Sequence, residues 1–213
     1  MWDEENSIRC ITSVTNTIDN YIFSRKEMEY SKEKFIDLCV GICYVFNIWT
    51  GQTWVGDRKE KDISDAFQNF FVFLYKLVCS INDNKNYSAY DERFFAKFIS
   101  YTGKVYRYLG KNNSQEQEVV VPVYNDIYVS WSKLPHSSYI ESKLYGTMTW
   151  MAANIQSPYF GIDLEGFEKI LIRLTNEKCK VTRGNEREVV FPTFKECIME
   201  VRYIEEDEDD DKI

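Results

Sequence analysis

The spacing of the apolar residues changes near residue 103, and this change limits the folds open to the chain. Before that point, apolar side chains recur every three or four residues, as on one face of an α-helix. This spacing predicts helices at about 8–22, 35–49, 62–79 and 89–101. After it, short β-rich runs alternate with polar turns. A helical part followed by a strand-rich part predicts an α+β fold.

The second half is predicted to contain strands with one helix among them. The helix is expected at about 139–155. The predicted strands are 104–109, 119–123, 125–130, 169–174, 188–191 and 196–204. No flexible linker separates the halves, so residues 1–204 are predicted to form one α+β domain. Its helical part would be 1–102 and its strand-rich part 103–204.

The acidic residues are concentrated at the end of the chain. Of the formal net charge of −8, residues 205–212 contribute −6, because they hold seven acids and one lysine. Residues 205–213 are therefore predicted to be a solvated acidic tail, although contact with a basic partner stays open. The rest of the chain has a formal net charge of −2, so its charges nearly balance. It shows no obvious row of basic residues that would bind a phosphate backbone.

Several functional classes are disfavoured by what the sequence lacks. No apolar run approaches the ~20 residues that span a bilayer, and the first residues are acidic, unlike a secretory signal. The six scattered cysteines and single histidine suggest reduced thiols in a cytoplasmic protein, without a zinc site or a Ser-His or Cys-His nucleophile. Neither GxxxxGK[ST] nor GxGxxG is present to support a kinase or a dehydrogenase.

Two glutamates stand one residue apart where a predicted strand begins. Glu186 and Glu188 precede the apolar run 189–191. Strand alternation would direct both carboxylates to the same face. They are interpreted either as a solvated acidic strand end or as a carboxylate pair that acts on a substrate.

Three short motifs follow one another in the strand-rich half. They are Tyr106-Arg107, Ser130-Trp131-Ser132 and Glu186-Arg187-Glu188. Over about 104–204, this order resembles the Arg, Ser-x-Ser, Glu-x-Glu pattern of the R-S-E class of mono-ADP-ribosyltransferases, which includes bacterial toxins and phage-encoded modifiers. Trp131 stands where the family usually has threonine, and Thr193 stands where it commonly has glycine.

The resemblance implies a fold and a role for each glutamate. The expected fold is a helical N-terminal half packed against a split β-sandwich that holds NAD. Glu188 would stabilise the positive charge that grows on the ribose as nicotinamide leaves. Glu186 would orient or deprotonate the acceptor.

The resemblance also implies residues that bind NAD and the acceptor. Arg107 would bind an NAD phosphate or ribose, because its planar guanidinium can donate two parallel hydrogen bonds to a phosphate. Tyr106, Ser130 and Ser132 would complete the NAD site. A loop containing Arg183 and Asn185 would meet the acceptor. Structural interpretations of the same residues are an ion pair for Arg107 and strand-end capping for the serines.

The resulting expectation is an enzyme that transfers ADP-ribose from NAD, as substrate, to a macromolecule without a metal. A protein acceptor, including an arginine side chain, is favoured over nucleic acid. The protein would act in the cytoplasm of its own or a target cell as a toxin or effector, with a cognate antitoxin or inhibitor as a further partner and no membrane. The alternative is a non-catalytic acidic binding protein of the immunity or inhibitor type.

Overall fold

A computed structural model describes residues 3–51, 61–109, 128–135, 149–176, 181, 187–192 and 197–203. The predicted strand at 119–123 and the acidic tail at 205–213 lie outside the described residues. Helices and an antiparallel sheet are both present, so the predicted α+β class is confirmed.

The contacts within the chain divide it into two compact units. Unit 1 comprises Met1–Ser100 and Ile162–Arg183, and unit 2 comprises Tyr101–Gly161 and Gly184–Ile213. The helical unit therefore includes a segment from the second half of the sequence, where the apolar spacing predicts strands.

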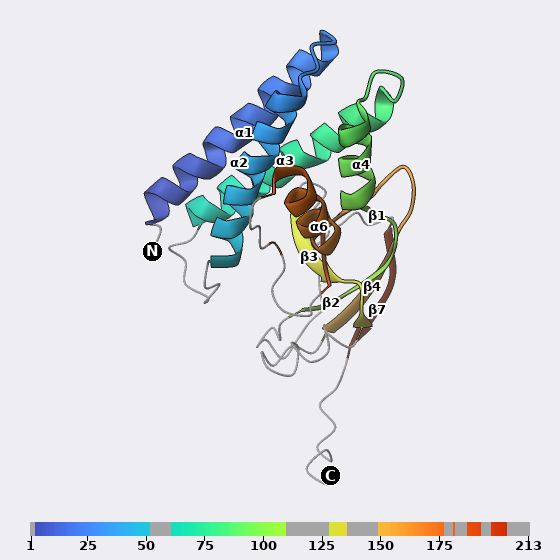
Figure 1. The fold of residues 1–213 in the computed structure, drawn as a ribbon. Coiled ribbons are helices and arrows are strands. Elements are labelled where there is room, and N and C mark those ends of the chain that lie inside the picture. Colours follow the sequence, from blue (N-terminus) through green and yellow to red (C-terminus); the bar gives the residue numbers. More distant parts are fainter. Residues whose placement is uncertain are drawn as a thin grey trace. The chain divides into compact units, whose positions relative to one another are not determined.

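Unit 1 is built from helices, shown in Figure 1. The helices predicted in the first half are confirmed, except that the last predicted helix ends at Ile99 and residues 100–101 form β1. α1 begins after Asp3, whose carboxylate accepts a 2.8 Å hydrogen bond from the Asn6 backbone N–H. The bounds are α1 Glu4–Lys26, α2 Lys32–Gly51, α3 Lys61–Asp83, α4 Tyr90–Ile99 and α6 Leu164–Thr175.

Aromatic side chains form the core of unit 1. The Phe46 ring lies 4.8 Å from Phe167 and 5.7 Å from Phe70, measured between ring centroids. Phe167 also meets Phe95 edge to face at 5.4 Å. Because Phe167 is fully buried and belongs to α6, this late helix is an integral part of the helical core.

The prediction of a strand at 169–174 is wrong, because these residues lie in α6. Asp163 caps the helix by accepting from the N–H groups of Glu165 and Gly166 at 3.1 and 3.3 Å. Asn176 ends it in the left-handed conformation, with φ of 58°. The apolar run at 170–172 is too short to distinguish the spacing of a helix from that of a strand. The helical spacing of the buried residues of α6 is visible only when Leu164 and Phe167 are included.

α2 is the helix in the described part of the chain whose length and composition would suffice to cross a membrane. Its buried residues include Phe35, Leu38, Ile42 and Phe46. A helix with such a stripe packed in a protein core meets the same criteria as a membrane span.

The strands form one seven-stranded sheet in the order β1-β5-β6-β3-β2-β4-β7. The neighbours from β6 to β7 pair antiparallel. The two short strands β1 and β5 contain two of the three points at which the chain passes between the units. The bounds are β1 Ser100–Tyr101, β2 Gly103–Leu109, β3 Tyr128–Ser132, β4 Thr149–Ile155, β5 Gly161–Asp163, β6 Glu188–Pro192 and β7 Ile198–Tyr203.

The predicted helix at 139–155 is wrong over 149–155, where β4 lies, and residues 139–148 are outside the described part. β4 pairs with β2 along its whole length, from Thr149 opposite Leu109 to Ile155 opposite Gly103, and with β7 on its other side. Its central residues, Ala152 and Ala153, suit a helix by intrinsic propensity. Hydrogen bonding on both edges of β4 overrides that propensity.

One face of the sheet carries the core of unit 2. Val105, Trp131, Met151 and Val189 from four strands form part of one buried cluster. Trp131 is 2% exposed, so its predicted place in the core is confirmed.

Candidate functional site

The strands that carry the three motifs are neighbours at the centre of the sheet. β2 holds Tyr106 and Arg107, β3 holds the serines, and β6 begins with Glu188. Their order in the sheet is β6-β3-β2. The fold of unit 2 therefore brings together motifs that are far apart in the sequence.

Tyr106, Ser132 and Glu188 form one row across these three strands. Tyr106 is in register with Ser132, and Ser132 is in register with Glu188. Residues directly opposite each other on antiparallel strands share a face, with Cβ atoms about 4.5–5.5 Å apart. We call these three residues the motif row. Across β2, β3 and β6, the row runs from a tyrosine through a serine to a glutamate.

Glu188 is buried, with 4% of its surface exposed, and Ser132 is 7% exposed. The interpretation of Glu188 as a solvated strand-end acid does not fit this burial. Removing a carboxylate from water is costly unless hydrogen bonds or an opposite charge compensate it. The buried position of Glu188 therefore requires compensating interactions.

Arg107 lies on the other face of the sheet from the motif row. It is in register with Met151, which belongs to the buried core cluster together with Val105, two residues earlier. Alternation along β2 separates its side chain from that of Tyr106. The Arg107 Nη1 donates a hydrogen bond to the Ser130 carbonyl, so the guanidinium contacts the backbone of β3. Its predicted contact with NAD stays a prediction.

The two serines of the middle motif differ in their surroundings. The Ser132 hydroxyl donates to the Leu134 carbonyl at 2.8 Å and accepts from the Leu134 N–H at 3.0 Å. It thereby closes the turn that follows β3. Ser130 is half-buried and in register with Val190. It lies two residues before Ser132 in β3 and therefore on the same face of the sheet.

The backbone changes direction immediately before Glu188. Arg187 is exposed and has a φ of 46°, in the left-handed region. β6 begins at Glu188, so the alternation used to align Glu186 with Glu188 does not extend across Arg187. Glu186, Arg183 and Asn185 lie outside the described residues.

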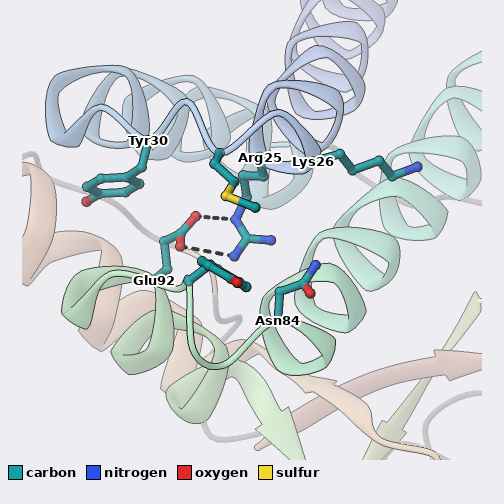
Figure 2. A pocket seen from close by; sticks show the side chains of 7 residues that line it. Arg25, Lys26, Tyr30, Asn84 and Glu92 are labelled. Atoms are coloured by element: carbon teal, nitrogen blue, oxygen red, sulfur yellow. Dashed lines mark hydrogen bonds and ion pairs between the residues drawn. The ribbon is translucent and has the colours of Figure 1, made fainter.

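Unit 1 contains a pocket that the sequence analysis did not anticipate. It has a volume of about 170 Å³ and lies where the α1–α2 and α3–α4 turns meet. Figure 2 shows Arg25 and Glu92 facing each other at its centre, with Asn84 beside them. The lining residues are Arg25, Lys26, Met28, Tyr30, Asn84, Tyr87 and Glu92.

The ion pair in this pocket is buried and well satisfied. Arg25 Nε lies 2.5 Å from Glu92 Oε1, and the two side chains are 5% and 1% exposed. The guanidinium also donates to the Ser80 carbonyl and to the Ser88 hydroxyl, each at 2.8 Å. Glu92 accepts further bonds from the Tyr21 hydroxyl at 2.9 Å and from the Ala89 N–H at 3.1 Å. These contacts join α1, α3 and α4.

Burial and nearby charges raise the pKa values of two tyrosines around Glu92. Burial raises the pKa of Tyr21 strongly, and the Glu92 charge and hydrogen bond raise it further. Burial, with the charges of Asp91 and Glu92, raises the pKa of Tyr30 to about 12. Both phenols therefore stay neutral at physiological pH.

The sequence held a signal for this ion pair. Arg25 falls on the apolar stripe of α1, after Ile18 and Tyr21, and Glu92 falls on the stripe of α4 with Phe95. A charged residue at an apolar position requires a partner. Arg25 and Glu92 have opposite charges, so the sequence marks them as possible partners, although α2 and α3 separate them along the chain.

Within the described residues, no group of three or more His, Cys, Asp or Glu side chains is placed to hold a metal. Comparisons with known protein families, with curated protein sequences and with solved structures found no match. The function is therefore argued from the geometry of the two units.

Proposed function

We propose that this protein is an NAD-dependent mono-ADP-ribosyltransferase whose catalytic carboxylate is Glu188. The proposal rests on the adjacency of the three motif strands, in the order β6-β3-β2, with Glu188 in register with Ser132. The described strands form one sheet and not two packed sheets, so NAD is proposed to lie against the motif-row face of that sheet.

The reaction breaks the bond between the ribose C1′ and the nicotinamide nitrogen. Nicotinamide leaves with the bonding electrons, and positive charge develops on the ribose. Glu188 stabilises this charge, because a buried carboxylate acts in a medium that screens it weakly. The acceptor nucleophile then bonds to C1′ and loses its proton, with Glu186 as the proposed base.

The serine of the motif row shapes the end of β3 beside Glu188, because its single hydroxyl hydrogen is donated to the Leu134 carbonyl. Ser132 is directly opposite Glu188, and its hydroxyl is fixed by the turn at Leu134. Tyr106 extends the row by one strand. Arg107 lies on the opposite face of the sheet from the motif row, and its guanidinium contacts the Ser130 carbonyl, so the proposed NAD site does not include it.

The substitution Glu188→Gln tests the proposal. It removes the charge but keeps the size of the side chain, so nicotinamide release and ADP-ribose transfer should fall by about 10²–10³-fold. The assay follows release of nicotinamide from NAD, and the label on protein and nucleic acid fractions when adenylate-labelled NAD is incubated with cell extract. Glu186→Gln should depress transfer and spare NAD hydrolysis, because water can still attack.

The matched control is Glu27→Gln, an exposed glutamate at the end of α1. It should leave both activities unchanged, and circular dichroism should show all variants folded. Equal transfer by wild type and Glu188→Gln would remove Glu188 from the mechanism. If wild-type protein turns over no NAD with any extract, the alternative of a non-catalytic acidic binding protein replaces the enzyme.

A further inference from the structure

The outward face of α4 combines exposed aromatic rings with unpaired positive charges. Tyr90, Phe94 and Phe98 recur every four residues and form one row along the helix. Tyr90 is 64% exposed and Phe98 36% exposed, and Phe94 is half-buried. Phe23 and Met28 of unit 1 are also exposed, but neither belongs to such a row.

The rings of this row contact one another. Tyr90 and Phe94 are stacked, with centroids 5.5 Å apart and an angle of 23° between their planes. Phe94 and Phe98 lie 4.7 Å apart. The mutual contacts hold the rings in place, so little conformational entropy is lost when a planar group stacks on them.

Positive charges flank the row on both sides. Arg93 and Lys97 are exposed and lie next to the aromatic row on the helix surface, also four residues apart. On the other side, the Arg173 guanidinium of α6 lies 4.5 Å above the Phe94 ring. We call these six residues the aromatic-basic face.

The packing of α6 against α4 fixes this arrangement. A Cβ atom at Gly166 would lie 2.0 Å from the Phe98 carbonyl oxygen, so the glycine permits a close approach of the two helices. Figure 1 shows α4 and α6 side by side within unit 1. The fold thus adds Arg173 to a face whose other members lie in α4.

The nearby described acids are largely engaged elsewhere. Asp91 lies 3.6 Å from Lys32, and Glu165 pairs with Lys169 at 2.8 Å. Glu168 accepts a hydrogen bond from the Val181 N–H at 2.9 Å. In the described part of the molecule, no ion pair is present for Arg93, Lys97 or Arg173. The aromatic-basic face is therefore locally positive on an acidic protein.

We propose that the aromatic-basic face binds single-stranded nucleic acid. Exposed rings offer stacking surfaces for unpaired bases, and the flanking cations offer contacts for the phosphates. An acidic peptide would pair with the positive charges, but its carboxylates would not stack on the aromatic rings. A duplex keeps its bases stacked internally and could reach only the cations. This proposal does not depend on the transferase activity.

The test uses the full chain and a fluorescein-labelled, mixed-sequence 20-nucleotide single strand, as DNA and as RNA, in fluorescence anisotropy. Binding should weaken as salt rises, with a slope of log K against log salt of about −2 for three phosphate contacts. Arg93→Glu/Lys97→Glu should weaken binding at least tenfold and flatten this slope. Tyr90→Ala should weaken binding at least fivefold, with the slope unchanged.

The matched control is Lys26→Glu/Lys34→Glu, which makes the same charge change at exposed lysines of α1 and α2. It should leave binding within twofold. The proposal is overturned if wild type does not bind single strands at 50 mM salt, or if the control variant loses as much affinity. It is also overturned if polyglutamate competes as well as the oligonucleotide, since the face would then bind acidic peptides.

Discussion

Glu92 in unit 1 and Glu188 in unit 2 are both buried glutamates, and their neighbours differ. Glu92 meets Arg25, with Nε–Oε1 at 2.5 Å, and accepts further bonds from Tyr21 and Ala89. The positions in register with Glu188 lead instead to hydroxyl groups, at Ser132 and then Tyr106. The only arginine of β2, Arg107, alternates to the other face.

The difference teaches how burial should be interpreted. A buried carboxylate paired with a guanidinium joins helices, and its charge is neutralised on the spot. In the proposed mechanism, Glu188 is the carboxylate that stabilises the cation formed as nicotinamide leaves. Both glutamates are buried, so burial alone does not distinguish the two roles.

The largest loss of stability is expected from replacing Glu92, the glutamate that pairs with Arg25. Glu92→Ala should lower the free energy of unfolding by about 3–5 kcal/mol, because it leaves the Arg25 guanidinium buried without its counter-charge. Urea denaturation measures this value. Glu5→Ala, which removes an exposed ion pair with Arg9, is the control and should change stability by less than about 1 kcal/mol.

A double-mutant cycle sharpens the same prediction. Arg25→Ala with Glu92→Ala should cost clearly less than the sum of the two single changes, because the second substitution removes the charge that the first one stranded. Additive costs would show that the two residues stabilise unit 1 independently, and the contrast with Glu188 would weaken.

A smaller effect is expected at the hydroxyl that contacts Glu92. Tyr21→Phe removes a 2.9 Å hydrogen bond to a charged acceptor and keeps the ring, so it should cost about 1.5–3 kcal/mol. The measurement is again the midpoint and slope of urea denaturation. A neutral result would mean that the Tyr21 ring, and not its hydroxyl, supports the ion pair.

The smallest effect is expected at Tyr30, and it depends on pH. Among the described residues its buried hydroxyl has no hydrogen-bond partner, so Tyr30→Phe should change stability at pH 7 by less than about 0.5 kcal/mol. The folded pKa, about 12, lies above the usual value of 10. Between these values the unfolded chain has lost the phenolic proton and the folded chain retains it, so stability falls as pH rises.

Tyr30→Phe should therefore make the loss of stability between pH 10 and 12 less steep than in wild type. Thermal unfolding monitored across this range provides the measurement. An unchanged pH dependence would assign the alkaline loss to Tyr21, whose pKa is also raised, or to other groups.

The sequence predicted that the three motifs belong to strands, and this part of the prediction is confirmed. The motifs at Tyr106, Ser132 and Glu188 were found from residue types and order, and their strands are neighbours. The register that leaves Arg107 on the other face could not be predicted, because a shift of one residue exchanges the two faces of a strand. Likewise, α6 and β4 exchanged their predicted types, because short apolar segments fit both periods.

The sequence by itself determined the α+β class and the four helices of the first half, since a stripe repeated over several turns fits only one period. Only the tertiary structure decided which late segments joined which unit, how Arg25 met Glu92, and how Arg173 came to flank the α4 aromatics. Those outcomes depend on contacts between residues distant in the chain, for which local spacing carries no information.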